Sequence, residues 1–252
     1  DCVSHAWRHL RDPISWTTST DPKNIMLTVP VEADGLFHPI TIPGVSHMEF
    51  EGFAGNGISV NGAMYVVYMT DHTEEEIAGR SVLAKSVDDA WSFTYVYELS
   101  NRLEDGKFVE VAMVEVDAAD VPGLPASGKT VLIWGSGKYR ESNPYLACVP
   151  SASIEHKSAI RYFSGTDEFG IPQWSSEEFD AAPLFIHPQI GEFSVVWYER
   201  VQRFIMLYGA LTPRGIQFRH AVKPWKWSDR QTLYHPWTDH GYGYFVHVAD
   251  SA

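Results

Sequence analysis

Short runs of β-branched and aromatic residues recur along the chain in the same order three times. The sets are "GAMYVVYMTD", "RSVLAKS" and "FTYVYEL", then "GKTVLIWGSG", "NPYLACVP" and "AIRYFSG", then "VQRFIMLYGAL", "GIQFRHAVK" and "QTLYHP". A further apolar run precedes each set: "NGISV", "FVEVAMVEV" and "EFSVVWYE". Clusters of Gly, Pro, Asn and Asp separate the runs, which is typical of strands joined by turns. The sequence therefore predicts an all-β fold with four antiparallel strands, three times over.

Serial four-stranded units favour a β-propeller, because radial packing buries both faces of each sheet. Ala84, Ala147 and Ala221 hold similar places in the third strand of each set. Their spacing exceeds the roughly 40 to 50 residues of a usual blade, and we assign the excess to long connections such as residues 166–191. Residues 1–49 are expected to be part of another blade, and "GYGYFVHVAD" one more strand that closes the ring. We expect one domain over residues 1–252, with a β-sandwich as the alternative.

The stretch "GLPASGKT", residues 123–130, fits the phosphate-binding pattern G-x-x-x-x-G-K-[ST]. That pattern binds phosphate only where a helix follows, since the helix N-terminus receives the anion. Here "VLIW" follows Thr130 and stops at Gly135, which indicates a strand. We therefore predict a loop that leads into the second strand of a blade, and no nucleotide site.

Charge and composition exclude several classes of partner. The net charge of −13 argues against binding to nucleic acid or anionic lipid. No apolar run approaches the roughly 18 residues of a membrane helix, so we expect no membrane insertion. The chain begins at Asp1 without an initiator Met or a signal peptide, and we expect a processed or trimmed piece. Cys2 and Cys148 permit one disulfide or two free thiols and lack the spacing of a zinc site. We expect no cofactor, because no motif requires one, and a metal ion in a central pocket is an alternative left open.

"SVDDAWSF", residues 86–93, resembles the Asp-box turn of sialidase-type propellers, S-x-D-x-G-x-x-W. Ala90 replaces the usual Gly. We expect Asp88 to bond backbone N–H groups in the turn between two outer strands. This motif bears on the fold and not on a functional site.

Propeller topology would bring the starts of the inner strands and the loops between second and third strands to one face. The residues concerned are Glu49, Glu51, Glu110, His187 and Glu192 on the strands, and Asp71, His72, Arg80, Lys138, Tyr139, Arg140, Glu141 and Arg214 in the loops. Carboxylates that face one another suit acid–base chemistry, because their surroundings can raise one pKa and leave the other group ionised. A nearby arginine can hold a carboxylate charged or bind substrate.

We predict Glu192 as a catalytic carboxylate, because it opens a strongly apolar inner strand, with Asp71 and Glu51 as candidate partners. Arg140 is the expected clamp on substrate or carboxylate, and further substrate contacts are expected from Arg80, Tyr139 and His187. Alternatives stay open at this stage. Asp71 could cap a turn, Glu110 could point to solvent, and His187 could be an ordinary hydrogen-bonded histidine.

Parts of the chain resemble a family of bacterial five-bladed β-propellers long known as a domain of unknown function. The similar stretches include "GSGKYRESNPYLACVP", "RYFSG", "GEFSVVWYERVQRFIMLYG" and "IQFRHAVKPWKWS", and the resemblance covers about residues 50–240. Some members are endo-D-arabinanases that act on mycobacterial cell-wall arabinan. The resemblance implies a secreted or envelope protein, monomeric, that hydrolyses a furanose-containing polysaccharide with carboxylates around a central pocket. A non-catalytic carbohydrate-binding propeller is the alternative.

The family usually carries an acidic residue near the axis on an N-terminal blade. This chain starts inside what would be that blade, and Asp1 or Asp12 would be the remnant.

Overall fold

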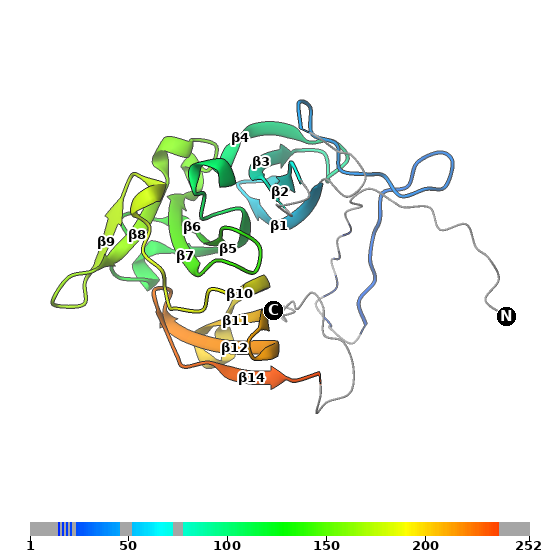
Figure 1. The fold of residues 1–252 in the computed structure, drawn as a ribbon. Coiled ribbons are helices and arrows are strands. Elements are labelled where there is room, and N and C mark those ends of the chain that lie inside the picture. The colour runs from blue at the N-terminus through cyan, green and yellow to red at the C-terminus, as the bar shows by residue number, and fades with distance from the viewer. Residues whose placement is uncertain are drawn as a thin grey trace.

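The strands form three antiparallel sheets in which neighbours along the chain pair with one another (Figure 1). The computed structural model describes residues 24–45, 52–72 and 78–236, and residues 15, 17, 19 and 21; of residues 52–55 it describes the backbone only. The first sheet consists of β1 (Gly52–Val60), β2 (Ala63–Thr70), β3 (Arg80–Ser86) and β4 (Thr94–Asn101).

The second sheet consists of β5 (Glu110–Asp117), β6 (Lys129–Ser136), β7 (Pro144–Pro150), β8 (Arg161–Thr166) and β9 (Pro172–Ser175). The third consists of β10 (Ile190–Tyr198), β11 (Arg203–Leu211), β12 (Arg214–Lys223), β13 (Lys226–Trp227) and β14 (Gln231–Tyr234). The helical elements in the described part of the chain are single 3₁₀ turns: η1 (Arg102–Glu104), η2 (Ala118–Asp120), η3 (Ser151–Ser153), η4 (Lys157–Ala159), η5 (Glu178–Asp180) and η6 (Glu199–Val201).

The prediction of an all-β fold with four strands in series, three times, is confirmed. Two short strands were not predicted. β9 adds a fifth strand inside the connection 166–191, and β13 has only two residues. Strands this short carry no alternating pattern that a sequence could reveal. None of the helical turns in the described residues is long or apolar enough to cross a membrane.

The second sheet lies between the other two and is buried on both faces. Along β6, Val131 and Ile133 pack against the first sheet, whereas Leu132 and Trp134 pack against the third. Each of these side chains contributes on the order of 1.5–3 kcal/mol by leaving water. Double-sided burial explains why "VLIW", residues 131–134, is apolar at every position instead of alternating.

The far face of the first sheet is covered by Ile40, Ile42 and Val45. The described residues 24–45 form turns and an isolated bridge between Val31 and Phe37, so they add no strand to the three sheets. Part of a further blade was expected in residues 1–49, and the rest of that range lies outside the described residues. The expected strand at residues 241–250 lies outside them as well.

Two sequence motifs lie as predicted. The carboxylate of Asp88 accepts the Ser92 backbone N–H at 2.9 Å in the turn between β3 and β4. Hydrogen bonds from Ser92 and Ser86 lower the pKa of Asp88 to about 2. In "GLPASGKT", Lys129 begins β6 directly, so a strand and not a helix follows the Gly-rich loop.

The first strands of the three sheets, β1, β5 and β10, lie at sheet edges and contact one another in turn, β1 with β5 and β5 with β10 (Figure 1). Because β5 and β10 each begin at this shared edge, their first residues come close together. The loop between β6 and β7 returns to the same end of the second sheet. This arrangement positions the candidate site.

Candidate functional site

Glu192 lies at the start of β10, where the strand is irregular. The pairing of β10 with β11 shifts register between Ile190 and Phe193, so Gly191 and Glu192 form a bulge. Bulges of this kind change the direction of a side chain and are frequent beside active sites. The side chain of Glu192 is 14% exposed, so it is mostly shielded from solvent yet still reachable.

Two residues of the β6–β7 loop hold the Glu192 carboxylate. The hydroxyl of Tyr139 donates a hydrogen bond to Oε1 at 2.5 Å, and Nη2 of Arg140 lies 3.5 Å from Oε2. The guanidinium of Arg140 also lies over the Tyr139 ring, 4.8 Å from its centroid. One carboxylate oxygen of Glu192 therefore accepts a hydrogen bond, and the other has a positively charged ion-pair partner.

The backbone of Arg140 is fixed against β10. Its N–H donates to the carbonyl of Ile190 at 3.1 Å, and its φ of 56° lies in the left-handed region that non-glycine residues seldom adopt. Gly191 leaves room for the arginine side chain, since a Cβ there would lie 3.1 Å from Nε of Arg140. The loop and the bulge are thus fitted to one another, and Arg140 has little freedom to move away.

Glu110, the first residue of β5, is the second carboxyl group of the site. It is 9% exposed. Burial first, and then the negative charge of Glu192, raise the pKa of Glu110, which lies at about 8. A hydrogen bond from the backbone of Phe193 and the positive charge of Arg140 act in the opposite direction. At neutral pH the site therefore holds a protonated carboxyl group beside a charged carboxylate.

The sequence left open that the side chain of Glu110 points to solvent, and its burial excludes that alternative. Glu110 sits among alternating apolar residues, a pattern that usually places every second side chain in solvent. β5 is the inner strand of the second sheet and lies between β1 and β10, so its first four residues are buried whichever face they point to. The informative signal was the position of Glu110 in its strand. It is the first residue of β5, and Glu192 lies near the start of β10.

Asp71 and Arg80 pair with each other on the first sheet. Nε of Arg80 donates to Oδ2 of Asp71 at 2.5 Å, and its Nη1 lies 3.3 Å from Oε2 of Glu98. Asp71 is exposed and has a φ of 59°, as a turn residue can have. Both ion pairs of Arg80 lie within the first sheet. The side chain of Asp71 is thus bound by Arg80, and its role as a catalytic partner of Glu192 stays a prediction.

His187 is buried just before β10 and is 6% exposed. Its ring nitrogens lie 3.0 Å from the Tyr208 hydroxyl and 3.2 Å from the Thr212 carbonyl, and its backbone N–H donates to Oδ1 of Asn143 at 2.7 Å. Burial lowers its pKa. These contacts connect the segment before β10 to the third sheet and to the β6–β7 loop. His187 therefore helps to position the strand and the loop that carry the site residues.

The remaining predicted candidate, Glu51, lies outside the described residues. Within the part of the chain that the structure describes, no group of three or more His, Cys, Asp and Glu side chains is placed to hold a metal ion. Cys148 is a buried free thiol, and burial raises its pKa to about 12. This cysteine belongs to the core and not to the site.

Several solved structures resemble this fold at low sequence identity. The α-L-arabinofuranosidase Arb93A of Fusarium graminearum, in complex with an iminosugar inhibitor, is 10% identical over 73% of this chain and 48% of its own, with a TM-score of 0.43. The Penicillium chrysogenum α-L-arabinanase complexed with arabinobiose is 11% identical over 75% and 51%, with a TM-score of 0.41. The GH43_1 enzyme from Xanthomonas citri complexed with xylose is 10% identical over 72% and 74%, with a TM-score of 0.31. The chain spans about half the length of the first two proteins.

None of the curated proteins compared with the chain matches it. One family profile does match, over residues 6–251, which is nearly the whole chain. The protein therefore belongs to the family described as "Domain of unknown function (DUF4185)".

Proposed function

We propose that the protein is a glycoside hydrolase that cleaves a furanose-containing polysaccharide such as arabinan. The observation that carries the proposal is the pair formed by Glu110 and Glu192, one protonated and the other charged at neutral pH. Hydrolysis of a glycosidic bond needs one group in each state. The substrate class follows from the resemblance to propellers that include endo-D-arabinanases. We further propose that the three sheets are blades of one propeller, five-bladed as that resemblance implies.

In this mechanism Glu110 acts as the general acid. Its proton moves to the glycosidic oxygen while the bond from that oxygen to the anomeric carbon breaks. Glu192 faces the anomeric carbon and acts either as nucleophile or as the base that takes a proton from the attacking water. The separation of the two carboxyl groups distinguishes these routes, since about 5–5.5 Å suits the nucleophile and about 6.5–9.5 Å leaves room for water.

Tyr139 and Arg140 position Glu192 for either route. A hydrogen bond on one oxygen and an ion pair on the other favour one orientation of this carboxylate, and small misplacement of a reacting group lowers rates steeply. The side chain of Arg140 is 30% exposed, so it can also bind hydroxyl groups of the substrate. Arg140 thereby links substrate binding to the placement of the reacting carboxylate.

A non-catalytic carbohydrate-binding protein is the alternative. The paired acids favour hydrolysis, because a site for a neutral sugar gains nothing from a buried carboxyl group beside a charged one, which costs stability. If the substrate is a cell-wall polymer, the protein must act outside the cytoplasm. We therefore expect a secreted or envelope location, and the full-length gene should encode an export signal.

Incubation with D-arabinan and with L-arabinan, followed by analysis of released oligosaccharides, tests the function. Wild-type protein should release products from one of them. Glu192→Gln should lower turnover by about 10²- to 10⁴-fold, the usual contribution of an acid–base group. Glu199→Gln is the matched control, because Glu199 lies beyond the far end of β10 and is exposed. Saturable binding of arabinan fragments by wild-type protein without any release would favour the binding protein instead.

A further inference from the structure

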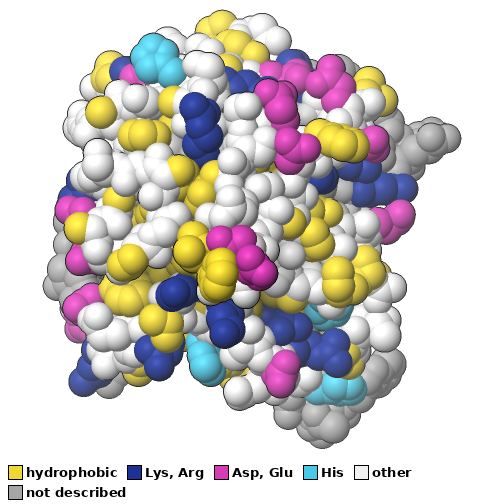
Figure 2. Space-filling model, turned by 90° about the vertical axis from the view of Figure 1, so that its left-hand side faces the viewer, with side chains coloured by type: hydrophobic (Ala, Val, Ile, Leu, Met, Phe, Trp, Pro, Cys, Tyr) yellow, Lys and Arg dark blue, Asp and Glu magenta, His cyan; other side chains and the backbone are white. Residues whose placement is uncertain are grey.

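The basic residues of this acidic protein are concentrated in its third sheet. Residues 199–236 contain seven Lys and Arg but only two Asp and Glu, whereas the whole chain has 19 and 32. Lys and Arg side chains are frequent across the lower part of the face in Figure 2, the part of the molecule in which the third sheet lies in Figure 1. This part of the third sheet thus differs in charge from the chain as a whole.

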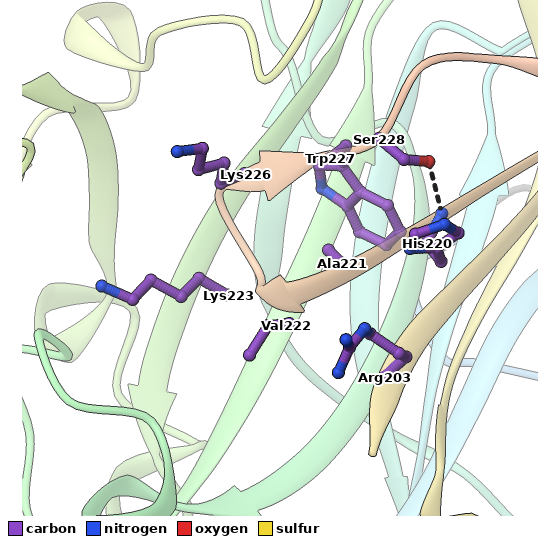
Figure 3. A pocket seen from close by; sticks show the side chains of 8 residues that line it. All are labelled: Arg203, His220, Ala221, Val222, Lys223, Lys226, Trp227 and Ser228. Atoms are coloured by element: carbon purple, nitrogen blue, oxygen red, sulfur yellow. Dashed lines mark hydrogen bonds between the residues drawn. The ribbon is translucent and has the colours of Figure 1, made fainter. Parts of the chain in front are cut away.

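A pocket of about 400 Å³ opens within this basic region (Figure 3). Its walls come from the start of β11, the end of β12, and β13, and are lined by Arg203, His220, Ala221, Val222, Lys223, Lys226, Trp227 and Ser228. Arg203 pairs with Tyr198, six residues along β10 from Glu192. At about 3.3 Å per residue, the pocket lies roughly 20 Å from Glu192, so it is separate from the candidate active site.

Two lysines of the lining lie beside one another at one edge of this pocket. Lys223 and Lys226 are directly paired across β12 and β13, and they extend side by side in Figure 3. Like charges in this position destabilise a sheet. Among the described residues neither lysine forms an ion pair, and the contact of Lys223 is with the ring of Trp225, 6.0 Å from its centroid. A bound anion would relieve the repulsion between them.

Two acidic residues, Glu199 and Asp229, lie close to the pocket in the sequence. Oε2 of Glu199 accepts a hydrogen bond from the Trp197 indole at 2.7 Å, and Oε1 accepts one from the Gln202 amide at 2.6 Å. Both carboxylate oxygens therefore have neutral donors of their own. Asp229 directly follows Ser228 of the pocket wall and is exposed, so it adds one negative charge beside the three Lys and Arg residues of the lining, which still leaves the pocket with a net positive charge.

Trp227 provides a rigid apolar wall beside these charges. Its indole N–H donates to the Pro224 carbonyl at 2.9 Å, and its ring packs edge-on against Trp134 at 6.2 Å between centroids. The ring is half-buried, so part of it faces the pocket together with Ala221 and Val222. An aromatic wall of this kind suits the C–H face of a sugar ring.

We propose that this pocket binds an acidic sugar, a sugar unit that carries a phosphate or a carboxylate. Lys223, Lys226 and Arg203 bind the anionic group, and Trp227 contacts the sugar ring. The pocket volume suits a small ligand, and a longer polyanion would meet the acidic surface of the rest of the protein. The proposal does not depend on the hydrolase function, because none of these residues belongs to the candidate active site.

Calorimetric titration at low ionic strength tests the proposal with glucose 6-phosphate and glucuronate, and with glucose and inorganic phosphate as reference ligands. We expect both acidic sugars to bind more tightly than either reference. Lys223→Gln combined with Lys226→Gln should weaken this binding about tenfold or more, since charged hydrogen bonds to the anion are lost. The matched control combines Lys129→Gln with Lys157→Gln, two exposed lysines of the second sheet with the same change in charge. The control should bind as wild type does.

Three results would overturn the proposal. The first is the absence of saturable binding by either acidic sugar. The second is binding of inorganic phosphate as tight as that of glucose 6-phosphate. The third is an equal loss of affinity in both double variants. Binding of phosphatidylserine vesicles that only the Lys223 and Lys226 variant loses, without binding of acidic sugars, would replace the sugar with a membrane surface. Equal thermal midpoints of the two double variants verify that any difference is not caused by unfolding.

Discussion

Replacing Glu110 with Gln removes the carboxyl proton that the proposed mechanism transfers to the glycosidic oxygen. Glutamine has nearly the same shape and its side-chain oxygen can still accept the hydrogen bond from the backbone of Phe193. It cannot ionise and cannot donate a proton to a leaving group. The substitution should therefore change two measurable properties in opposite directions, the stability of the fold and the rate of hydrolysis.

The effect on stability depends on pH. The pKa of Glu110 rises from 4.5 to about 8 on folding, so between these values the folded protein retains a proton that the unfolded chain has released. The free energy of unfolding of wild type therefore falls by about 1.4 kcal/mol per pH unit through this window from this group alone. Between pH 5 and pH 8 the loss is about 3 to 4 kcal/mol. Glu110→Gln avoids this loss. Its free energy of unfolding relative to wild type should therefore increase by that amount between pH 5 and pH 8.

Urea unfolding of both proteins at pH 5 and pH 8 measures this difference, and hydrolysis assays over the same range give the second readout. Wild-type activity should decline above about pH 8, where Glu110 loses its proton, and Glu110→Gln should be about 10²- to 10⁴-fold less active throughout. A stability difference that is the same at pH 5 and pH 8 would refute the raised pKa. Near-normal activity of Glu110→Gln would remove this residue from the mechanism.

Three further outcomes are expected. Tyr139→Phe removes the donor on Oε1 of Glu192 but keeps the ring beneath Arg140, so kcat should fall about tenfold at an unchanged thermal midpoint, and a normal kcat would show that the hydroxyl is dispensable. Arg140→Ala should raise KM for arabinan fragments and lower kcat as well, and steady-state kinetics in which neither parameter changes would exclude the clamp. Asp88→Ala should lower the thermal midpoint at pH 7 without changing activity. Because the pKa of Asp88 is lowered to about 2, this stabilisation is present above about pH 3.8 and lost as the pH falls through 2, so a destabilisation that persists below pH 2 would contradict the reasoning.

The strand order could be predicted because turn residues bound each apolar run and because the runs recur in the same order three times. The convergence of Glu192, Tyr139 and Arg140 could be predicted as well, since it follows from which ends of the strands meet and requires no knowledge of side-chain contacts. The burial of Glu110 could not be predicted, because a polar residue among apolar ones usually points to solvent, whereas the first four residues of β5 are all buried. The pairing of Arg80 with Asp71 and Glu98 also needed the structure, since Glu98 lies on the next strand.

His187 illustrates a different limit. Its position before β10 correctly placed it near the loops of the site, but its ring is directed toward Tyr208 and Thr212. A sequence locates a residue at a strand end, whereas the direction of its side chain depends on the packing of neighbouring sheets.

The crystal structure of Glu192→Gln with a bound arabino-oligosaccharide tests the central claim most directly. The variant should bind the substrate without cleaving it, because the carboxylate that attacks or activates water is gone. If Glu110 is the general acid, one glycosidic oxygen should lie within hydrogen-bonding distance of its carboxyl group. The adjoining anomeric carbon should face residue 192. An oligosaccharide bound away from both residues, or bound with Glu110 out of reach of every glycosidic oxygen, would contradict that claim.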